Sequence, residues 1–167
     1  MIALFEGLPT HPFVVHLPVV LVPLATIGVL AMALRPRWHR TFGPVVTALA
    51  AVGFVAAIIA SRSGESLEDE YRAAGETIST TLRDHAEAGE RVPLLAGLFL
   101  LILLVWVLFD RWRARAGEAT ATEEARRPKQ VAAALAVLTV LSAGVASAAV
   151  YQAGHSGASS VWEQEQP

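Results

Sequence analysis

The chain lacks cysteine and carries few charged residues. None of its 167 residues is a cysteine, which excludes disulfides, thiolate nucleophiles, cysteine-ligated iron–sulfur clusters and covalent c-type haem attachment. Charged residues make up 17% of the chain, whereas a water-soluble domain usually has about a quarter. The formal net charge of −2 provides no basic surface for nucleic acid. These absences argue against a soluble enzyme and a nucleic-acid-binding protein.

Four long runs of the sequence contain no Asp, Glu, Lys or Arg: residues 12–34, 41–61, 92–109 and 131–151. At about 1.5 Å rise per residue, each run is long enough as a helix to cross a hydrocarbon layer of roughly 30 Å. The sequence therefore predicts an all-α integral membrane protein. We expect a four-helix bundle of up-and-down topology that forms a single membrane domain over residues 1–167.

The charges between the runs predict which side of the membrane each link occupies. Residues 35–40 and 110–130 are rich in Arg, whereas residues 62–91 carry more acids than Arg. Because positively charged links remain in the cytoplasm, we expect residues 110–130 to form a cytoplasmic linker. Both termini and the middle loop are then extracytoplasmic, in a protein of the cytoplasmic (inner) membrane.

The acidic middle loop also carries an apolar pattern with helical spacing. One face of a helix would be shared by Leu67, Tyr71, Ala74, Ile78 and Leu82. Residues 66–88 are therefore predicted to form an amphipathic outer helix between the second and third spans. An upward extension of the third span, with a kink or restart at Pro93, is the alternative.

Small residues predict where the spans pack closely, because close approach is what joins helices in lipid. Two ladders of four-residue spacing carry this prediction: Gly53, Ala57 and Ser61, and Ala132, Ala136, Gly144 and Ala148. No internal repeat is evident in the sequence. His39 lies beside Arg37 and Arg40 and is expected to be a solvated interface residue.

Four of the five histidines fall at the predicted outer end of the bundle: His11, His16, His85 and His155. His16 lies inside an apolar run, where an ionisable side chain usually faces the protein interior. A b-type haem requires two imidazoles from different helices, and His11 and His16 are about 140° apart on one helix. The expected axial pair is therefore His16 with His85 or His155.

Other roles for these residues remain open. Arg62 and Arg91 close the outer ends of two spans, where they would pair with haem propionates or anchor the helices at the interface. A copper or zinc site formed by His16, His85 and His155 is a rival to haem. In a purely structural role, the imidazoles would bond to carbonyls that prolines leave free.

Several motifs resemble those of a bacterial four-helix membrane family known as a domain of unknown function. His11-Pro-Phe-Val-Val-His-Leu-Pro18 resembles its H-P-x-x-V-H-F-P start, and Ser63-Gly64 follows the second span as in the family. His85-Ala-Glu-Ala-Gly89 resembles its H-x-x-x-G before the third span, and Gly154-His-Ser-Gly157 resembles its G-H-x-G-G after the fourth. The chain departs at Ala158, which replaces the second glycine, and at Gln164, which replaces a histidine of the family's tail.

The resemblance implies a function in membrane electron transfer, because family members occur joined to or beside Rieske and cytochrome-type redox modules. The expected function is an electron carrier or accessory subunit that binds haem b and exchanges electrons with quinol or an extracytoplasmic redox partner. The alternatives are a non-enzymatic assembly subunit with structural histidines and a membrane protein that binds copper or zinc. The protein is expected to contact the lipid bilayer. Whether it forms a homo-oligomer is left open.

Overall fold

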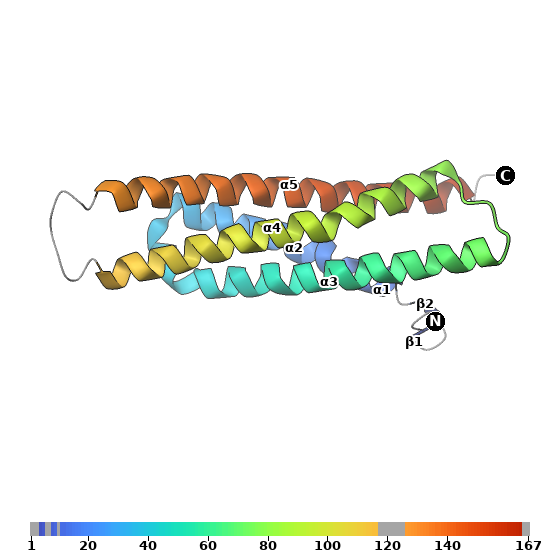
Figure 1. The fold of residues 1–167 in the computed structure, drawn as a ribbon, viewed down its shortest axis with the longest axis horizontal. Coiled ribbons are helices and arrows are strands. Elements are labelled where there is room, and N and C mark those ends of the chain that lie inside the picture. The colour runs from blue at the N-terminus through green and yellow to red at the C-terminus, as the bar shows by residue number, and fades with distance from the viewer. Residues whose placement is uncertain (1–3, 6–7, 10, 117–125, 165–167) are drawn as a thin grey trace.

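The computed structural model describes residues 4–5, 8–9, 11–116 and 126–164. Within these residues, four long helices lie side by side in an up-and-down bundle (Figure 1). All four are long and apolar enough to cross a membrane, which confirms the predicted fold class. The elements in chain order are β1 (Leu4–Phe5), β2 (Leu8–Pro9), α1 (His11–Val14), α2 (His16–Leu34), the 3-10 helix η1 (Pro36–Trp38), α3 (His39–Ala73), α4 (Thr80–Ala116) and α5 (Arg126–Gln164).

The bundle has two chemically different ends (Figure 1). At one end α1 begins, α3 ends, α4 begins and α5 ends; because it carries His11 and His85, we call it the histidine end. At the other end η1 joins α2 to α3 and α4 finishes; we call it the arginine end. The central part of the predicted linker, residues 117–125, lies outside the described residues, and its flanks belong to α4 and α5.

The predicted separate helix over residues 66–88 is wrong, because a turn divides this segment. Gly75 has a φ of 76°, the left-handed conformation that commonly follows a helix. Its N–H donates to the Arg72 carbonyl and the Glu76 N–H to the Tyr71 carbonyl, each at 3.1 Å. Ser79 then accepts the Leu82 N–H at 3.1 Å, which caps the start of α4. The alternative prediction holds for residues 80–88, which continue through Pro93 within α4.

Large apolar side chains fill the centre of the bundle and also cover its outside. Phe99, Met32 and Leu103 are among the largest fully buried side chains of the described residues. On the outside, side chains such as Ile27, Leu101 and Leu141 are exposed. An exposed apolar surface of this extent is typical of a protein that lies in lipid.

The small-residue ladder predicted for the fourth span is only partly correct. In α3, Gly53 and Ala57 are buried as expected. In α5, however, Gly144 and Ala148 are exposed, and the buried small residues lie one position before or two after Gly144, at Ala143 and Ala146. Both faces of this helix carry small residues, so spacing alone chose the wrong face.

The two helical hairpins, α2–α3 and α4–α5, repeat one burial pattern, which corrects the expectation that the chain has no internal repeat. The buried positions of α2 recur in α4 with the same order and spacing: Pro18, Val22, Ala25, Val29 and Met32 correspond to Val92, Ala96, Phe99, Leu103 and Trp106. The same holds for α3 and α5: Val46, Ala50, Gly53, Ala56 and Ala57 correspond to Thr139, Ala143, Ala146, Ala149 and Val150. Since α2 packs against α5 as α4 packs against α3, an approximate two-fold axis along the bundle relates the hairpins.

A small polar contact joins the two hairpins in the apolar core. The Thr26 Oγ1 lies 2.9 Å from the Ser147 Oγ, and it also approaches the Val22 carbonyl at 3.0 Å. Thr26→Val is expected to lower the free energy of unfolding by about 0.6 kcal/mol, the average for hydrogen bonds between membrane helices. Reversible unfolding in mixed micelles measures this change, with the exposed Thr41→Val as control. A loss as large as that of a core truncation would contradict this assignment.

Candidate functional site: two facing imidazoles at the histidine end

His11 lies on α1 and bonds across to α3. Its Nδ1 is 2.9 Å from the Ala60 carbonyl oxygen and 3.1 Å from the Ser63 Oγ. Because a carbonyl only accepts, the Nδ1 of His11 carries the proton and donates it. In the described part of the chain, the Nε2 of His11 has no hydrogen-bond partner. Its lone pair is therefore available to bind a metal.

His85 on α4 makes the same contacts with α5. Its Nδ1 is 2.9 Å from the Ala153 carbonyl oxygen and 3.4 Å from the Ser156 Oγ. The Ser156 hydroxyl lies between the Gln152 and Ala153 carbonyl oxygens, at 2.9 Å and 3.2 Å. The Nδ1 of His85 is therefore also protonated, and its Nε2 has no hydrogen-bond partner among the described residues.

A glycine lies under each imidazole ring. A Cβ added to Gly64 would lie 3.0 Å from the Cε1 of His11, and one added to Gly157 would lie 2.8 Å from the Cε1 of His85. A Cβ essentially never comes closer than 3.0 Å to another heavy atom, so a side chain at position 157 would displace the His85 ring, and one at position 64 would press tightly on the His11 ring. Each histidine thus contacts a segment of the same sequence pattern, Ala-x-x-Ser-Gly, on the neighbouring helix.

The two imidazoles lie next to each other, in an edge-to-face arrangement, where the two halves of the bundle meet. Their ring centroids are 6.2 Å apart and their planes are inclined by 72°. The structure therefore brings together His11 and His85, one from each hairpin, with both Nδ1 atoms engaged. This pair is the candidate functional site.

The other two histidines of this end lie elsewhere. His16 is exposed in the first turn of α2, and His155 is exposed and stacks on Tyr151 of its own helix, with ring centroids 5.9 Å apart. His11 lies seven residues before the buried Pro18 and therefore on the inward face of the helix, whereas His16 lies on an exposed face. Pro18 has no N–H for the Val14 carbonyl, which interrupts the backbone hydrogen bonding where α1 ends and α2 begins.

The two arginines predicted for this end are both exposed. Arg62 lies on α3 near the His11 contacts, and an Nη of Arg91 is 3.9 Å from a carboxylate oxygen of Glu87. Each side chain is long enough to reach a ligand at the surface of the bundle. Surface ion pairs of this kind contribute little to stability, so Arg91 is available for other partners.

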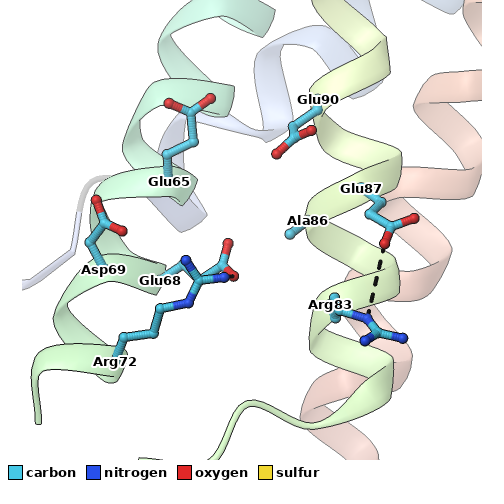
Figure 2. Close-up of a pocket in the computed structure, with 8 residues that line it drawn as sticks. All are labelled: Glu65, Glu68, Asp69, Arg72, Arg83, Ala86, Glu87 and Glu90. Carbon is cyan, nitrogen blue, oxygen red and sulfur yellow. Dashed lines mark hydrogen bonds and ion pairs between the residues drawn. The ribbon is translucent and has the colours of Figure 1, made fainter. Parts of the chain in front are cut away.

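A pocket of about 450 Å³ opens between α3 and α4 at the histidine end (Figure 2). Carboxylates dominate its lining and two arginines partly balance them: the residues are Glu65, Glu68, Asp69, Arg72, Arg83, Ala86, Glu87 and Glu90. Arg72 pairs with Glu68, and Arg83 lies 4.0 Å from Glu87. The pocket therefore has a net negative charge and favours cations over anions.

His39, at the arginine end, is buried, so the expectation of a solvated residue is wrong. Only 3% of the residue is exposed, its Nδ1 is 3.3 Å from a carboxylate oxygen of Asp110, and its ring lies 4.3 Å from that of Trp106. The reason is that α3 begins at His39 itself and places it on the same inward face as Gly43 and Val46. Its neighbours in sequence, which are basic, gave no sign of this orientation.

Among the described residues, no three His, Asp or Glu side chains lie close enough together to hold one metal ion. The fold and the site together define a membrane-type four-helix bundle with a pair of imidazoles, one from each hairpin, at one end. The chain belongs to the family of predicted membrane proteins DUF2231, whose model matches residues 7–165. This confirms the resemblance seen in the motifs. No match was found among curated proteins or among solved structures.

Proposed function

We propose that this protein is a membrane electron-transfer subunit that holds b-type haem between His11 and His85. The observation that carries the proposal is the facing pair of imidazoles, whose ring centroids are 6.2 Å apart. Two imidazoles bound through Nε2 on opposite sides of one metal have centroids roughly 6 Å apart, since each metal–nitrogen bond is about 2 Å. The observed separation therefore suits axial ligation of one iron.

The hydrogen bonds of both rings also suit ligation. A metal-bound imidazole usually donates its other N–H to a carbonyl or carboxylate, which fixes the tautomer and raises the basicity of the ligating nitrogen. His11 and His85 do this with the Ala60 and Ala153 carbonyls. A bound haem would supply reversible one-electron transfer, while the protein holds the two rings in place.

The charges around the pair support a placement for the rest of the site. The acidic pocket between α3 and α4 would repel haem propionates, whereas the exposed Arg62 and Arg91 would attract them. The basic links at the arginine end favour a cytoplasmic position for that end. The histidine end would then lie outside the inner membrane, where quinol or a redox protein with a basic surface exchanges electrons with the subunit.

The test is the visible spectrum of protein purified in mild detergent from haem-replete cells. We expect a Soret band with resolved α and β bands, as for iron with two imidazole ligands. His11→Ala and His85→Ala should each remove the α and β bands, whereas His16→Ala and His155→Ala should retain them. A colourless preparation without haem by the pyridine haemochrome assay contradicts the proposal.

The same contacts favour a second function, that of a non-enzymatic assembly subunit. Both imidazoles already join neighbouring helices through hydrogen bonds, as residues of purely structural importance would. In that case the alanine variants at positions 11 and 85 lose stability, and no variant changes the visible spectrum. Elemental analysis of the same preparation tests whether copper or zinc is bound.

A further inference from the structure

We infer that the site consists of two equivalent half-sites, one in each hairpin, with Gly64 and Gly157 as matched positioning residues. The ligand it suits is then a single metal centre that accepts two equivalent nitrogen donors on opposite sides. An asymmetric ligand such as a peptide would use two identical nitrogen donors unequally. This inference rests on the proposed function and specifies the ligand class of the same site.

Each half-site contains the same three parts. An imidazole Nδ1 donates to an alanine carbonyl at 2.9 Å, in His11 with Ala60 and in His85 with Ala153. A serine three residues after that alanine lies beside the same Nδ1, and the next residue is the glycine under the ring. The two halves of the chain therefore build one local structure twice.

The burial register of the helices shows that the equivalence of the half-sites is part of a larger repeat. His11 precedes the buried Pro18 by the same interval as His85 precedes the buried Val92. On the partner helices, Ala60 follows the buried Ala57 as Ala153 follows the buried Val150. The two-fold axis that relates the cores of the hairpins thus also relates the two imidazoles, which lie on either side of it.

The surroundings of the pair do not follow this symmetry. In the same register, His16 corresponds to Glu90 and Arg62 corresponds to His155. The two half-sites therefore have the same residue type at the imidazole, serine and glycine positions, and they differ at exposed positions next to these. This contrast explains why the four histidines at this end of the bundle do not form two pairs. It assigns ligand binding to His11 and His85 alone.

A measurement on haem-free protein tests the equivalence without relying on a bound ligand. In ¹⁵N spectra of histidine-labelled protein in micelles, two imidazoles besides His39, whose Nδ1 contacts the Asp110 carboxylate, should appear as neutral rings protonated at Nδ1. Ser63→Ala should shift one of these signals and Ser156→Ala the other. If only one imidazole has this form, the half-sites are not equivalent and the inference is overturned.

A second measurement uses the haem-loaded protein and four glycine variants. Gly64→Ala and Gly157→Ala displace one ring each, so each should weaken haem binding by a similar factor, about 10–100-fold, and shift the α band and the midpoint potential. Gly89→Ala and Gly144→Ala are matched controls, because a Cβ at either position meets nothing within 4 Å. They should leave binding and spectrum unchanged.

The outcomes separate this inference from the proposed function. If both His11→Ala and His85→Ala remove the α and β bands but only one imidazole of the haem-free protein is protonated at Nδ1, the proposed function stands and the equivalence of the half-sites is overturned. If the protein is colourless but both imidazoles show the same tautomer and matched serine responses, the haem proposal fails and the equivalent half-sites stand. Unequal effects of Gly64→Ala and Gly157→Ala also overturn the inference.

Discussion

Phe99→Ala is expected to lower the free energy of unfolding by about 3–5 kcal/mol, the usual cost of removing a fully buried aromatic side chain. Phe99 is 1% exposed and belongs to the cluster of buried residues that all four long helices share. In lipid, the contacts between helices depend on packing rather than on exclusion of water. The cavity left by the ring therefore removes contacts that nothing else replaces.

Unfolding in mixed detergent micelles, followed by tryptophan fluorescence, measures the effect of Phe99→Ala. Leu101→Ala is the control, because Leu101 lies two residues away on the same helix and is 59% exposed. Its side chain faces lipid in both the folded and the helical unfolded state, so its truncation should have little effect. Equal losses for the two variants would mean that the buried face of α4 is assigned incorrectly.

Gly28→Ala is expected to lower the free energy of unfolding by about 1–3 kcal/mol through overpacking. A Cβ at Gly28 would lie 2.5 Å from one Cγ of Val46 and 3.2 Å from the other. Valine in a helix strongly prefers one χ1 rotamer, so relief of these contacts requires either an unfavourable rotamer of Val46 or a separation of α2 and α3. The higher helix propensity of alanine, worth about 1 kcal/mol, offsets only part of this cost.

The double variant Gly28→Ala, Val46→Ala tests the cause of that loss. Val46→Ala removes both Cγ atoms, so the added methyl group at position 28 should cost nothing in this background. The double-mutant cycle should then give a coupling free energy close to the whole loss of the single variant, as expected for residues in contact. Additive effects would show that the two helices do not meet at this point.

The sequence was sufficient to predict the number of membrane helices, but not where the helices end. The first and last charged residues around each apolar run mark the edge of the hydrocarbon layer, not the end of the helix. A helix continues into water as long as its backbone stays hydrogen-bonded. α3 thus runs on to Ala73 and α4 begins at Thr80. Gly75 and Ser79, which form the turn, were visible in the sequence, but the apolar spacing across them suggested one continuous helix.

The buried faces of the helices were harder to predict, for a physical reason. In water, the polar side of a helix reveals its apolar side, whereas in lipid both the packed and the exposed faces are apolar. The ladder through Gly144 was therefore assigned to the wrong face. The repeat of the hairpins was missed for the same reason, because it is a repeat of burial: among its core positions, Ala50 and Ala143 are identical, but Ala25 corresponds to Phe99.

The sequence indicated the end of the bundle that carries the candidate site but not the histidines that meet there. His16 was favoured because it lies within an apolar run, but it is exposed in the structure. His11 was not part of the expected axial pair, although it lies seven residues before the buried Pro18 and therefore on the inward face of the helix. His85 was part of the expected pair, and its Nδ1 contacts the Ala153 carbonyl of α5.

The division of the imidazole pair between two hairpins has a consequence for biogenesis. The first hairpin leaves the ribosome with its own half of the site, and this half stays incomplete until α4 and α5 have inserted and docked. A ligand that needs both rings binds the assembled bundle only, so it stabilises that state in proportion to the logarithm of its concentration over its dissociation constant. Capture of the ligand would thus mark the chains that have finished assembly, and chains without it would be the first to reach membrane proteases.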